Sequence, residues 1–331
     1  MYESGLLVLA ELGLSLYPQL IKLININLES QVVIRFITFS ILGLLGCFIT
    51  SSSGLLEFSI LEYILIGLIN IFHVAASYST FKIFSSGTSY TLFYTQPIFN
   101  LLGRMLIYNE KIPASKFIYM LIALFGVYIL TSSSHSSNQT IEEQPIAIQS
   151  TDSNYDYYIT FGLFSGLVAA ITESVMYLLV KDKYSASIFQ NLTLFYLFGG
   201  IACASIVLYS MRVSPDITIS KEHNLDKDTL DKDTLDSKSF FNLFSNQYLD
   251  FNISYENLLK AIGFNAIIGF GGYFLLYYLV NKTSTILFNS LIFLGIIFSY
   301  MWGYLLSDES ILLENIIGSS LIIFAIFMLN L

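Results

Sequence analysis

The sequence predicts an all-α polytopic membrane protein with about ten transmembrane helices, arranged as two inverted five-helix repeats. Three observations lead to this prediction. Hydrophobic residues make up 55% of the chain, charged residues only 12%, and the mean hydropathy is +0.68. Apolar runs of membrane-spanning length recur along the chain, and the second half repeats features of the first. A soluble globule is excluded because this chain has too few polar residues to cover its surface.

A helical span of the bilayer needs about 20 apolar residues, and the chain offers about ten such runs. They lie near residues 5–24, 31–50, 60–83, 88–108, 113–131, 157–180, 186–211, 257–280, 284–306 and 311–330. The first run leads into further apolar runs rather than into a small-residue cleavage site. We therefore expect no cleavable signal peptide, and insertion directed by the first helix itself.

Two polar loops organise the chain. Residues 132–156 separate a first repeat, residues 1–131, from a second repeat, residues 157–331. A further polar loop at 213–253, which contains the letters LDKDTLDKDT, interrupts the second repeat. Both loops have the composition of disordered segments. They carry much of the formal charge of −9, so this charge does not indicate a surface for nucleic acid.

Three blocks of the second half match the first half in the same order. SLYPQLIK at 15–22 lies over SVMYLLVK at 174–181. Each later match pairs a residue of the first half with one of the second half. The pairs are Asn70 with Asn265, Tyr78 with Tyr273, Thr88 with Thr283, Ser89 with Ser284 and Glu110 with Glu309. An odd number of helices per repeat makes the second copy enter the membrane from the opposite side. Such inverted repeats are typical of secondary transporters.

A family resemblance lies in TSYTLFYTQPIFNLLGRMLIYNEKIPASKFIYMLIALFGVYIL, residues 88–130. It has a proline in the predicted fourth helix, an acidic residue that closes this helix and a glycine in the fifth. The segment resembles the EamA-like ten-helix transporters of the drug/metabolite transporter superfamily, which also holds nucleotide-sugar and triose-phosphate carriers. The resemblance covers nearly the whole chain and implies a solute carrier. The second half departs from the family pattern, with Ile296 where the proline is expected and four extra residues nearby.

Basic residues and glycosylation sequons predict the orientation. Lysine and arginine in short loops favour the cytoplasmic side. With both termini in the cytoplasm, the inner connections hold Lys111, Lys116, Lys181, Lys183 and Lys282, and the short outer ones hold Lys22, Arg35 and Lys82 near helix ends. The sequons at Asn138 and Asn252 then fall outside the cell or in a lumen, where N-glycosylation occurs. A plasma membrane and an endomembrane both satisfy this orientation.

Glu173 is the one charged residue within the apolar run at 159–180. Small residues spaced by four precede it and suit close helix packing: Gly162, Gly166 and Ala170. Glu173 and Tyr177 continue this row. A charge in the hydrocarbon costs about 2.5–3.5 kcal/mol, so it normally faces the bundle interior and marks a pathway. We expect Glu173 to exchange a proton or to pair with a cationic substrate; the alternative is a structural hydrogen bond to another helix.

His73 is the second candidate for proton coupling. It shares a helical face with Asn70 and Ser77, and histidine titrates near physiological pH. A hydrogen-bonded interior histidine without such a role is the alternative. The other two histidines, His135 and His223, fall in predicted loops, so we expect no metal site.

Polar stripes on the predicted helices mark a central substrate site. One stripe in the fourth helix follows a proline, and a comparable stripe with a proline bend runs along the first. The side chains expected to bind substrate are Gln19, Asn70, His73, Tyr94, Gln96, Asn100, Glu173, Tyr177, Asn265, Tyr273 and Asn289.

These features predict a secondary transporter that moves a small metabolite by alternating access, as an exchanger or with protons, without a cofactor. Arg35 and Arg104 are expected toward helix ends, and the interiors of the last four predicted helices hold no Lys or Arg. This favours a neutral or cationic substrate. The alternatives are a nucleotide-sugar or organic-phosphate antiporter of an organelle, and a membrane scaffold that keeps the shell without transporting. We expect no enzyme, because no paired aspartates, HExxH or Ser-His motif lies at membrane depth.

Overall fold

The secondary structure is helical. The computed structural model describes residues 2–50, 59–109, 111, 113–136, 152–180, 187–213, 253–280, 282, 291 and 293–330. Among these residues there are helices, turns and short irregular connections but no strand, which confirms the all-α class for this part of the chain. Both predicted loops fall largely outside the described residues, and so do Glu110, Asn138, Asn252 and Asn289.

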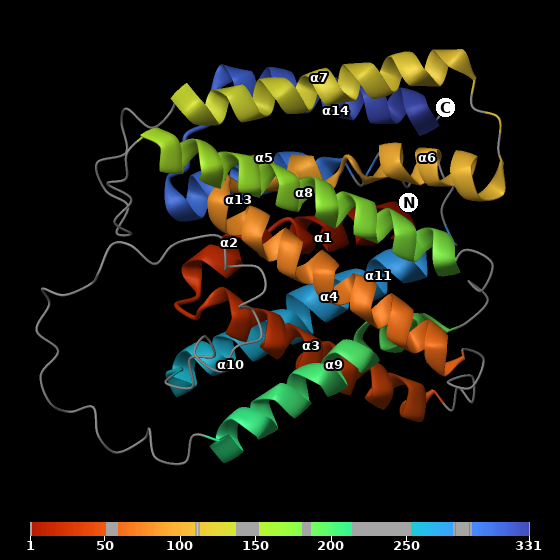
Figure 1. Cartoon of the computed structure of the whole chain (residues 1–331), viewed down its shortest axis with the longest axis vertical. Helices are drawn as coiled ribbons and strands as arrows, with labels where there is room; N and C mark the ends of the chain where they lie inside the picture. Colours follow the sequence, from red (N-terminus) through yellow and green to blue (C-terminus); the bar gives the residue numbers. More distant parts are fainter. Residues whose placement is uncertain are drawn as a thin grey trace, which may run out of the picture.

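Helices occupy the predicted apolar runs, although several runs are divided (Figure 1). In chain order they are α1 (Tyr2–Leu14), α2 (Tyr17–Leu23), α3 (Leu28–Ile49), α4 (Ile60–Ile83), α5 (Ser86–Phe93), α6 (Gln96–Tyr108), α7 (Ala114–Ser136), α8 (Asp152–Val180), α9 (Ile188–Val213), α10 (Tyr255–Phe264), the π-helix η5 (Asn265–Phe270), α11 (Gly271–Val280), α13 (Leu294–Ser307) and α14 (Leu313–Asn330). The backbones of α7 and α8 extend about five residues into the predicted loop at 132–156.

Six helical stretches of the described residues are long and apolar enough to cross a membrane. They are Tyr2–Leu23, Leu28–Ile49, Ile60–Ile83, Tyr157–Met176, Ile188–Leu208 and Tyr255–Leu279. Three shorter apolar helices accompany them: Ala114–Leu130, Leu294–Ser307 and Leu313–Leu329. Together these helices indicate a multi-pass membrane protein.

Proline explains two of the divided runs. Pro18 stands in the first two residues of α2, and Pro97 stands in the first two residues of α6. Proline has no N–H to donate and its ring clashes with the preceding turn, so a helix interior does not tolerate it without a break. The predicted bends at these two prolines are confirmed.

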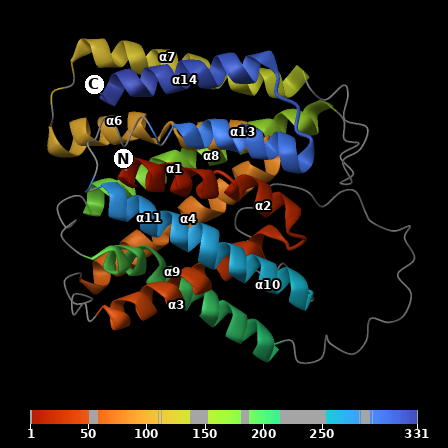
Figure 2. The ribbon, with the colours of Figure 1, turned by 180° about the vertical axis from the view of Figure 1, so that it is seen from behind.

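The helices pack side by side in a layered bundle. α7 and α14 lie together along one edge, α3 and α9 lie together at the other, and the remaining helices lie between them (Figures 1 and 2). Glycines let α7 and α14 approach closely, since a methyl group on Gly126 would lie 2.8 Å from the Gly318 carbonyl oxygen. The reverse contact, from a methyl group on Gly318 to the Gly126 carbonyl oxygen, would be 2.9 Å.

The small-residue row before Glu173 is also confirmed. A methyl group on Gly162 would lie 2.7 Å from Ile83, and one on Gly166 would lie 3.2 Å from Leu92. These neighbours belong to the end of α4 and to α5. The row therefore packs α8 tightly on both helices and turns Glu173 toward the interior, where only 8% of its surface is exposed.

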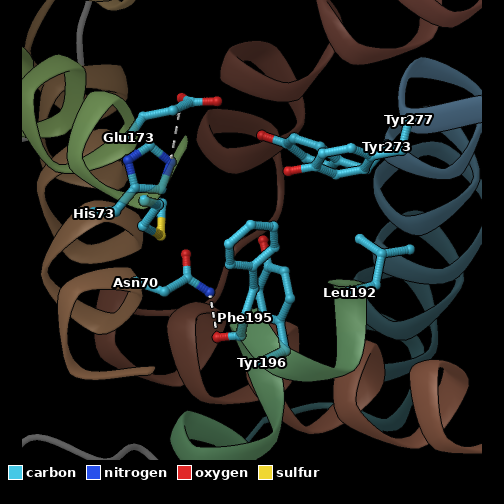
Figure 3. A pocket seen from close by; sticks show the side chains of 9 residues that line it. Asn70, His73, Glu173, Leu192, Phe195, Tyr196, Tyr273 and Tyr277 are labelled. Atoms are coloured by element: carbon cyan, nitrogen blue, oxygen red, sulfur yellow. Dashed lines mark hydrogen bonds and ion pairs between the residues drawn. The ribbon is translucent and has the colours of Figure 1, made fainter. Parts of the chain in front are cut away.

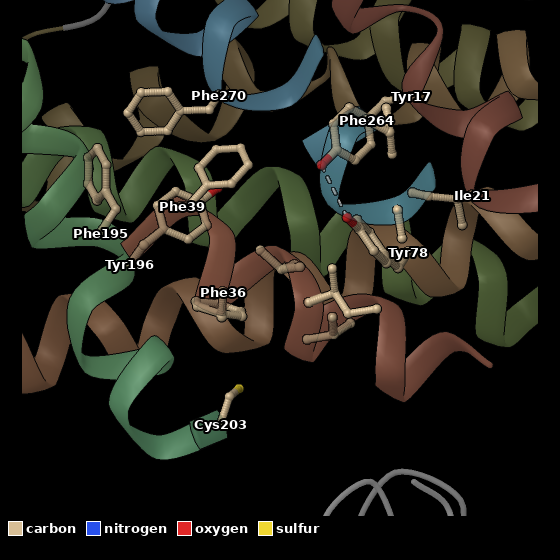
Figure 4. Close-up of a cluster of buried hydrophobic side chains, with 14 of the residues drawn as sticks. Tyr17, Ile21, Phe36, Phe39, Tyr78, Phe195, Tyr196, Cys203, Phe264 and Phe270 are labelled. Carbon is tan, nitrogen blue, oxygen red and sulfur yellow. Dashed lines mark hydrogen bonds between the residues drawn. The ribbon is translucent and has the colours of Figure 1, made fainter. Parts of the chain in front are cut away.

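The prediction that Arg35 lies toward a helix end is wrong. Asn27 caps α3 by accepting a hydrogen bond from the Ser30 backbone N–H at 2.9 Å, so the helix begins earlier than predicted. Arg35 then lies about two turns inside α3. Its guanidinium lies 5.0 Å from the centre of the Phe39 ring, which belongs, with Phe36, to a large hydrophobic cluster of the described residues (Figure 4).

Candidate functional site

A cavity lies between α4, α8, α9 and α11 (Figure 3). Its volume is about 20 Å³. The lining residues are Asn70, His73, Glu173, Met176, Leu192, Phe195, Tyr196, Tyr273 and Tyr277. As it stands the cavity has room for about one or two waters, so a larger ligand requires the helices around it to move.

Glu173 and His73 face each other across one wall of this cavity (Figure 3). His73 Nε2 lies 3.8 Å from Glu173 Oε2, and both side chains are buried. His73 Nδ1 lies 3.0 Å from the Ala169 carbonyl oxygen. Two residues predicted for proton coupling, from helices about 100 residues apart, therefore meet in one site.

The hydrogen-bond partners of His73 determine where its protons lie. A carbonyl oxygen only accepts, so Nδ1 carries a proton, and this leaves Nε2 toward the carboxyl group of Glu173. If Nε2 were bare and Glu173 ionised, two lone-pair atoms would face each other in a buried site. One proton on either group makes the contact favourable. The pair can therefore hold and release a single proton.

The opposite wall is aromatic. Tyr273 and Tyr277 on α11 point their hydroxyl groups toward Glu173 and His73 (Figure 3). On the floor, Asn70 Nδ2 donates to the Phe195 carbonyl oxygen at 2.8 Å, which ties α4 to α9. The cavity thus offers polar groups on two sides and ring faces between them, an arrangement typical of small-molecule sites.

Arg35 contacts two of the residues that line the cavity, Tyr196 and Tyr273. Its guanidinium lies 4.9–5.6 Å from the centres of five rings. These rings belong to Tyr17, Phe39, Tyr78, Tyr196 and Tyr273. Its Nη2 also donates to the Tyr196 hydroxyl at 2.7 Å. Sequence reasoning missed Arg35 as an interior group; the N-cap residue Asn27, which moves the start of its helix, was the available signal.

Glu11 is a second buried carboxylate that the predicted site left out. It is fully buried in α1, and its Oε2 accepts hydrogen bonds from Tyr94 at 2.8 Å and Tyr90 at 3.4 Å. Tyr94 was predicted to bind substrate. The structure instead directs its hydroxyl to Glu11, and Tyr94 is not among the residues that line the cavity.

The structure brings four predicted residues to the cavity: Asn70, His73, Glu173 and Tyr273. Five described ones are not among the lining residues: Gln19, Tyr94, Gln96, Asn100 and Asn265. Asn265 accepts a hydrogen bond from Tyr17, and Gln19 joins a polar cluster beside Glu309. Gln96 and Asn100 are partly buried on α6, outside the cavity lining. The side chain of Tyr177 and the whole of Asn289 lie outside the described residues.

The polar cluster at Glu309 joins distant parts of the chain. Glu309 Oε1 accepts from Lys22 Nζ at 2.5 Å and from Gln19 Nε2 at 2.8 Å. Its Oε2 accepts from the Ser86 backbone N–H at 2.8 Å. Ser307 also belongs to this cluster, because its hydroxyl donates to Gln19. These five residues connect α2 and the start of α5 to the segment that follows α13.

The described residues contain no group of three or more His, Cys, Asp and Glu side chains that could hold a metal ion. Cys47 and Cys203 are buried free thiols. The chemistry available at the cavity is therefore that of one carboxyl, one imidazole, tyrosine hydroxyls and a guanidinium behind them.

Comparisons with known proteins give a likeness at the level of the fold. No family model and no curated protein matches the chain. A solved structure described only as "Crystal structure of protein" is similar with a TM-score of 0.53 and 11% sequence identity. The match covers 98% of this chain and 94% of the other. At this identity the likeness shows a shared fold along the chain and says nothing of activity.

Proposed function

We propose that this protein is a secondary transporter of a small metabolite, built as an EamA-like member of the drug/metabolite transporter superfamily. Substrate binds in the cavity, and the helices around it open alternately to the two sides of the membrane. The observation that carries this proposal is the Glu173–His73 pair in the cavity wall. Ionisable groups inside a membrane bundle are costly and normally serve a pathway.

The packing of the helices supports the predicted inverted repeat. If the repeats are real, α1 and α2 correspond to α8, α3 to α9, α4 to α10–α11, α5 and α6 to α13, and α7 to α14. The observed neighbours follow this correspondence. Two helices pack against their own counterparts, α3 on α9 and α7 on α14. The correspondence also turns the contact between α4 and α8 into a contact between α11 and α1, and both contacts are present. A two-fold relation of this kind is what alternating access needs.

Matching backbone features support the same repeat. Asn109 ends α6 with φ 52°, and Asp308 ends α13 with φ 50°. Their N–H groups donate to the carbonyl oxygens of Arg104 and Gly303, five residues earlier in each case. The same offset along the chain relates Asn109 to Asp308 and Glu110 to Glu309. On this basis we propose about ten spans with both termini in the cytoplasm.

Proton movement provides the test, because it does not require the substrate to be known. The protein is reconstituted into liposomes that contain a pH-sensitive dye and is exposed to nucleotide sugars, nucleoside phosphates, amino acids, amines, sugars and carboxylates. A substrate that is coupled to protons changes the internal pH. In Glu173→Gln this change should disappear, since the amide cannot exchange a proton, whereas Glu256→Gln, at an exposed position, should behave like the wild type.

Two results would count against the proposal. Proton movement that is unchanged in Glu173→Gln would mean that the pair has a structural role. If no compound moves protons, exchanges across the membrane or raises the melting temperature, the non-transporting scaffold is the better description. Ligand binding at a hundredfold excess over Kd stabilises a protein by about 2.7 kcal/mol, so binding should be visible in the melting temperature.

A further inference from the structure

In the part of the chain that the structure describes, no acidic side chain forms an ion pair with Arg35. Among the described residues, the carboxylates that form ion pairs do so with Lys22, His73 and Lys260. Arg35 is 4% exposed, and its contacts are the five ring faces and the hydroxyl of Tyr196. Ring faces stabilise a cation, but they do not neutralise it. A buried cation with no anion beside it is suited to receive one.

Tyr196 connects Arg35 to the cavity. Its oxygen accepts from Arg35 Nη2 at 2.7 Å and from Nε at 3.3 Å, and its ring lines the cavity. The hydroxyl can still donate its own proton, and no described residue accepts that proton. Since a hydroxyl that accepts from a cation becomes a stronger donor, Tyr196 presents the positive charge of Arg35 to the cavity. Tyr273 lies against the same guanidinium and also lines the cavity.

We propose that the side of the cavity formed by Tyr196 and Tyr273 binds the carboxylate of a small organic acid. The substrate of the proposed transporter is then a monoanion. Tyr196 donates to the carboxylate directly, and Arg35 supplies the balancing charge from behind it. This inference rests on the proposed function and names its substrate class. It replaces the neutral or cationic metabolite that the expected position of Arg35 favoured.

The charges around the cavity select one negative charge rather than two. The lining residues include no lysine or arginine, and among the described residues Arg35 is the cation that contacts this side of the cavity. Glu173 lies in the opposite wall and adds negative charge when it is ionised. A phosphate ester with two charges would lack a second cation. When the Glu173–His73 pair carries a proton, it has no net charge. The single negative charge of a monocarboxylate then equals the single positive charge of Arg35, so the site as a whole is neutral.

Melting temperatures of the full-length protein in lipid nanodiscs test this inference. The ligands are two monocarboxylates of different size, lactate and benzoate, and three relatives of benzoate: benzamide, benzylamine and phenyl phosphate. We expect at least one monocarboxylate to raise the melting temperature, and the neutral, cationic and dianionic relatives to have smaller effects. Tyr196→Phe keeps the ring and removes the hydroxyl, which donates to the carboxylate and accepts from Arg35, so it should weaken carboxylate binding by about 10- to 100-fold.

Tyr300→Phe is the matched control, because the Tyr300 hydroxyl bonds to Ser319 and its ring is not part of the cavity lining. It should bind carboxylate like the wild type. If the Arg35→Met variant folds, it should not bind carboxylate. If it does not fold, the carboxylate affinity of Tyr196→Phe provides the test. Equal carboxylate binding by Tyr196→Phe and wild type would overturn the inference, as would the absence of any shift with both monocarboxylates.

The same experiments separate this inference from the proposed function. If benzylamine alone binds, and its binding depends on Glu173 and not on Tyr196, the carboxylate site is wrong while a transporter with a cationic substrate remains. If phenyl phosphate binds best, the organic-phosphate antiporter replaces the monocarboxylate carrier. If proton movement is absent for every compound in the liposome assay, proton coupling itself fails.

Discussion

Lys22, at the end of α2, forms an ion pair with Glu309, which lies 287 residues later in the chain and directly after α13. The two side chains are only 21% and 17% exposed, and Gln19 and Ser86 add hydrogen bonds to the same carboxylate. Under the predicted repeat, this pair joins the first half of the molecule to the second. Under the proposed alternating access, we expect this contact to be one of those that open.

The ion pair should contribute measurably to stability. We expect Lys22→Met and Glu309→Gln each to destabilise the protein by about 1.5–3 kcal/mol, because each leaves a charged or polar partner without its hydrogen bond. The double variant should cost less than the sum of the two single variants. Melting temperatures of the four proteins give this comparison. Additive effects would show that the two side chains act independently.

The contact between α7 and α14 should not accept a single methyl group. In Gly318→Ala the new carbon would lie 2.8 Å from Leu130 Cγ and 2.9 Å from the Gly126 carbonyl oxygen, so we expect a loss of about 1–3 kcal/mol. Gly263→Ala is the control, since nothing lies within 4 Å of its added carbon. It should stabilise α10 by about 0.5–1 kcal/mol. Equal melting temperatures for the two variants would contradict the observed packing.

The two helix ends with positive φ should respond alike to substitution. Asn109 and Asp308 have φ 52° and 50°, where a β-branched residue is strained. We expect Asn109→Val and Asp308→Val each to cost about 1–2 kcal/mol, and the glycine variants at both positions to be neutral or stabilising. Thermal unfolding of the four variants checks this. A valine tolerated at either position would mean that its helix does not end in this way.

Glu11 should act as a hydrogen-bond acceptor rather than as a proton carrier. Glu11→Gln keeps an oxygen for Tyr94 and Tyr90, so we expect the variant to fold and to retain proton movement. Glu11→Leu removes the acceptor and leaves two buried hydroxyls without it, at a cost of about 1–3 kcal/mol. Proton movement in the liposome assay and the melting temperature separate the two effects. Loss of proton movement in Glu11→Gln would assign the carrier role to Glu11 as well as to Glu173.

Local sequence patterns predicted much of the fold. Hydropathy located the helices, because a membrane span depends on the local density of apolar side chains. The proline bends at Pro18 and Pro97 and the small-residue row before Glu173 were also readable, since each depends on neighbours within about two turns. The apolar run predicts a later start for α3 than the structure has, because the capping residue Asn27 lies before the run and is polar.

The sequence by itself determined that this chain is an all-α membrane protein with Glu173 and His73 turned inward, because a polar group in a span must avoid lipid. Only the tertiary structure decided which inward groups meet. Glu173 lies against His73, Tyr196 lies between Arg35 and the cavity, and Tyr94 turns to Glu11. Such contacts depend on the relative rotation and offset of whole helices. Packing over the full length of those helices sets both, and no local pattern encodes them.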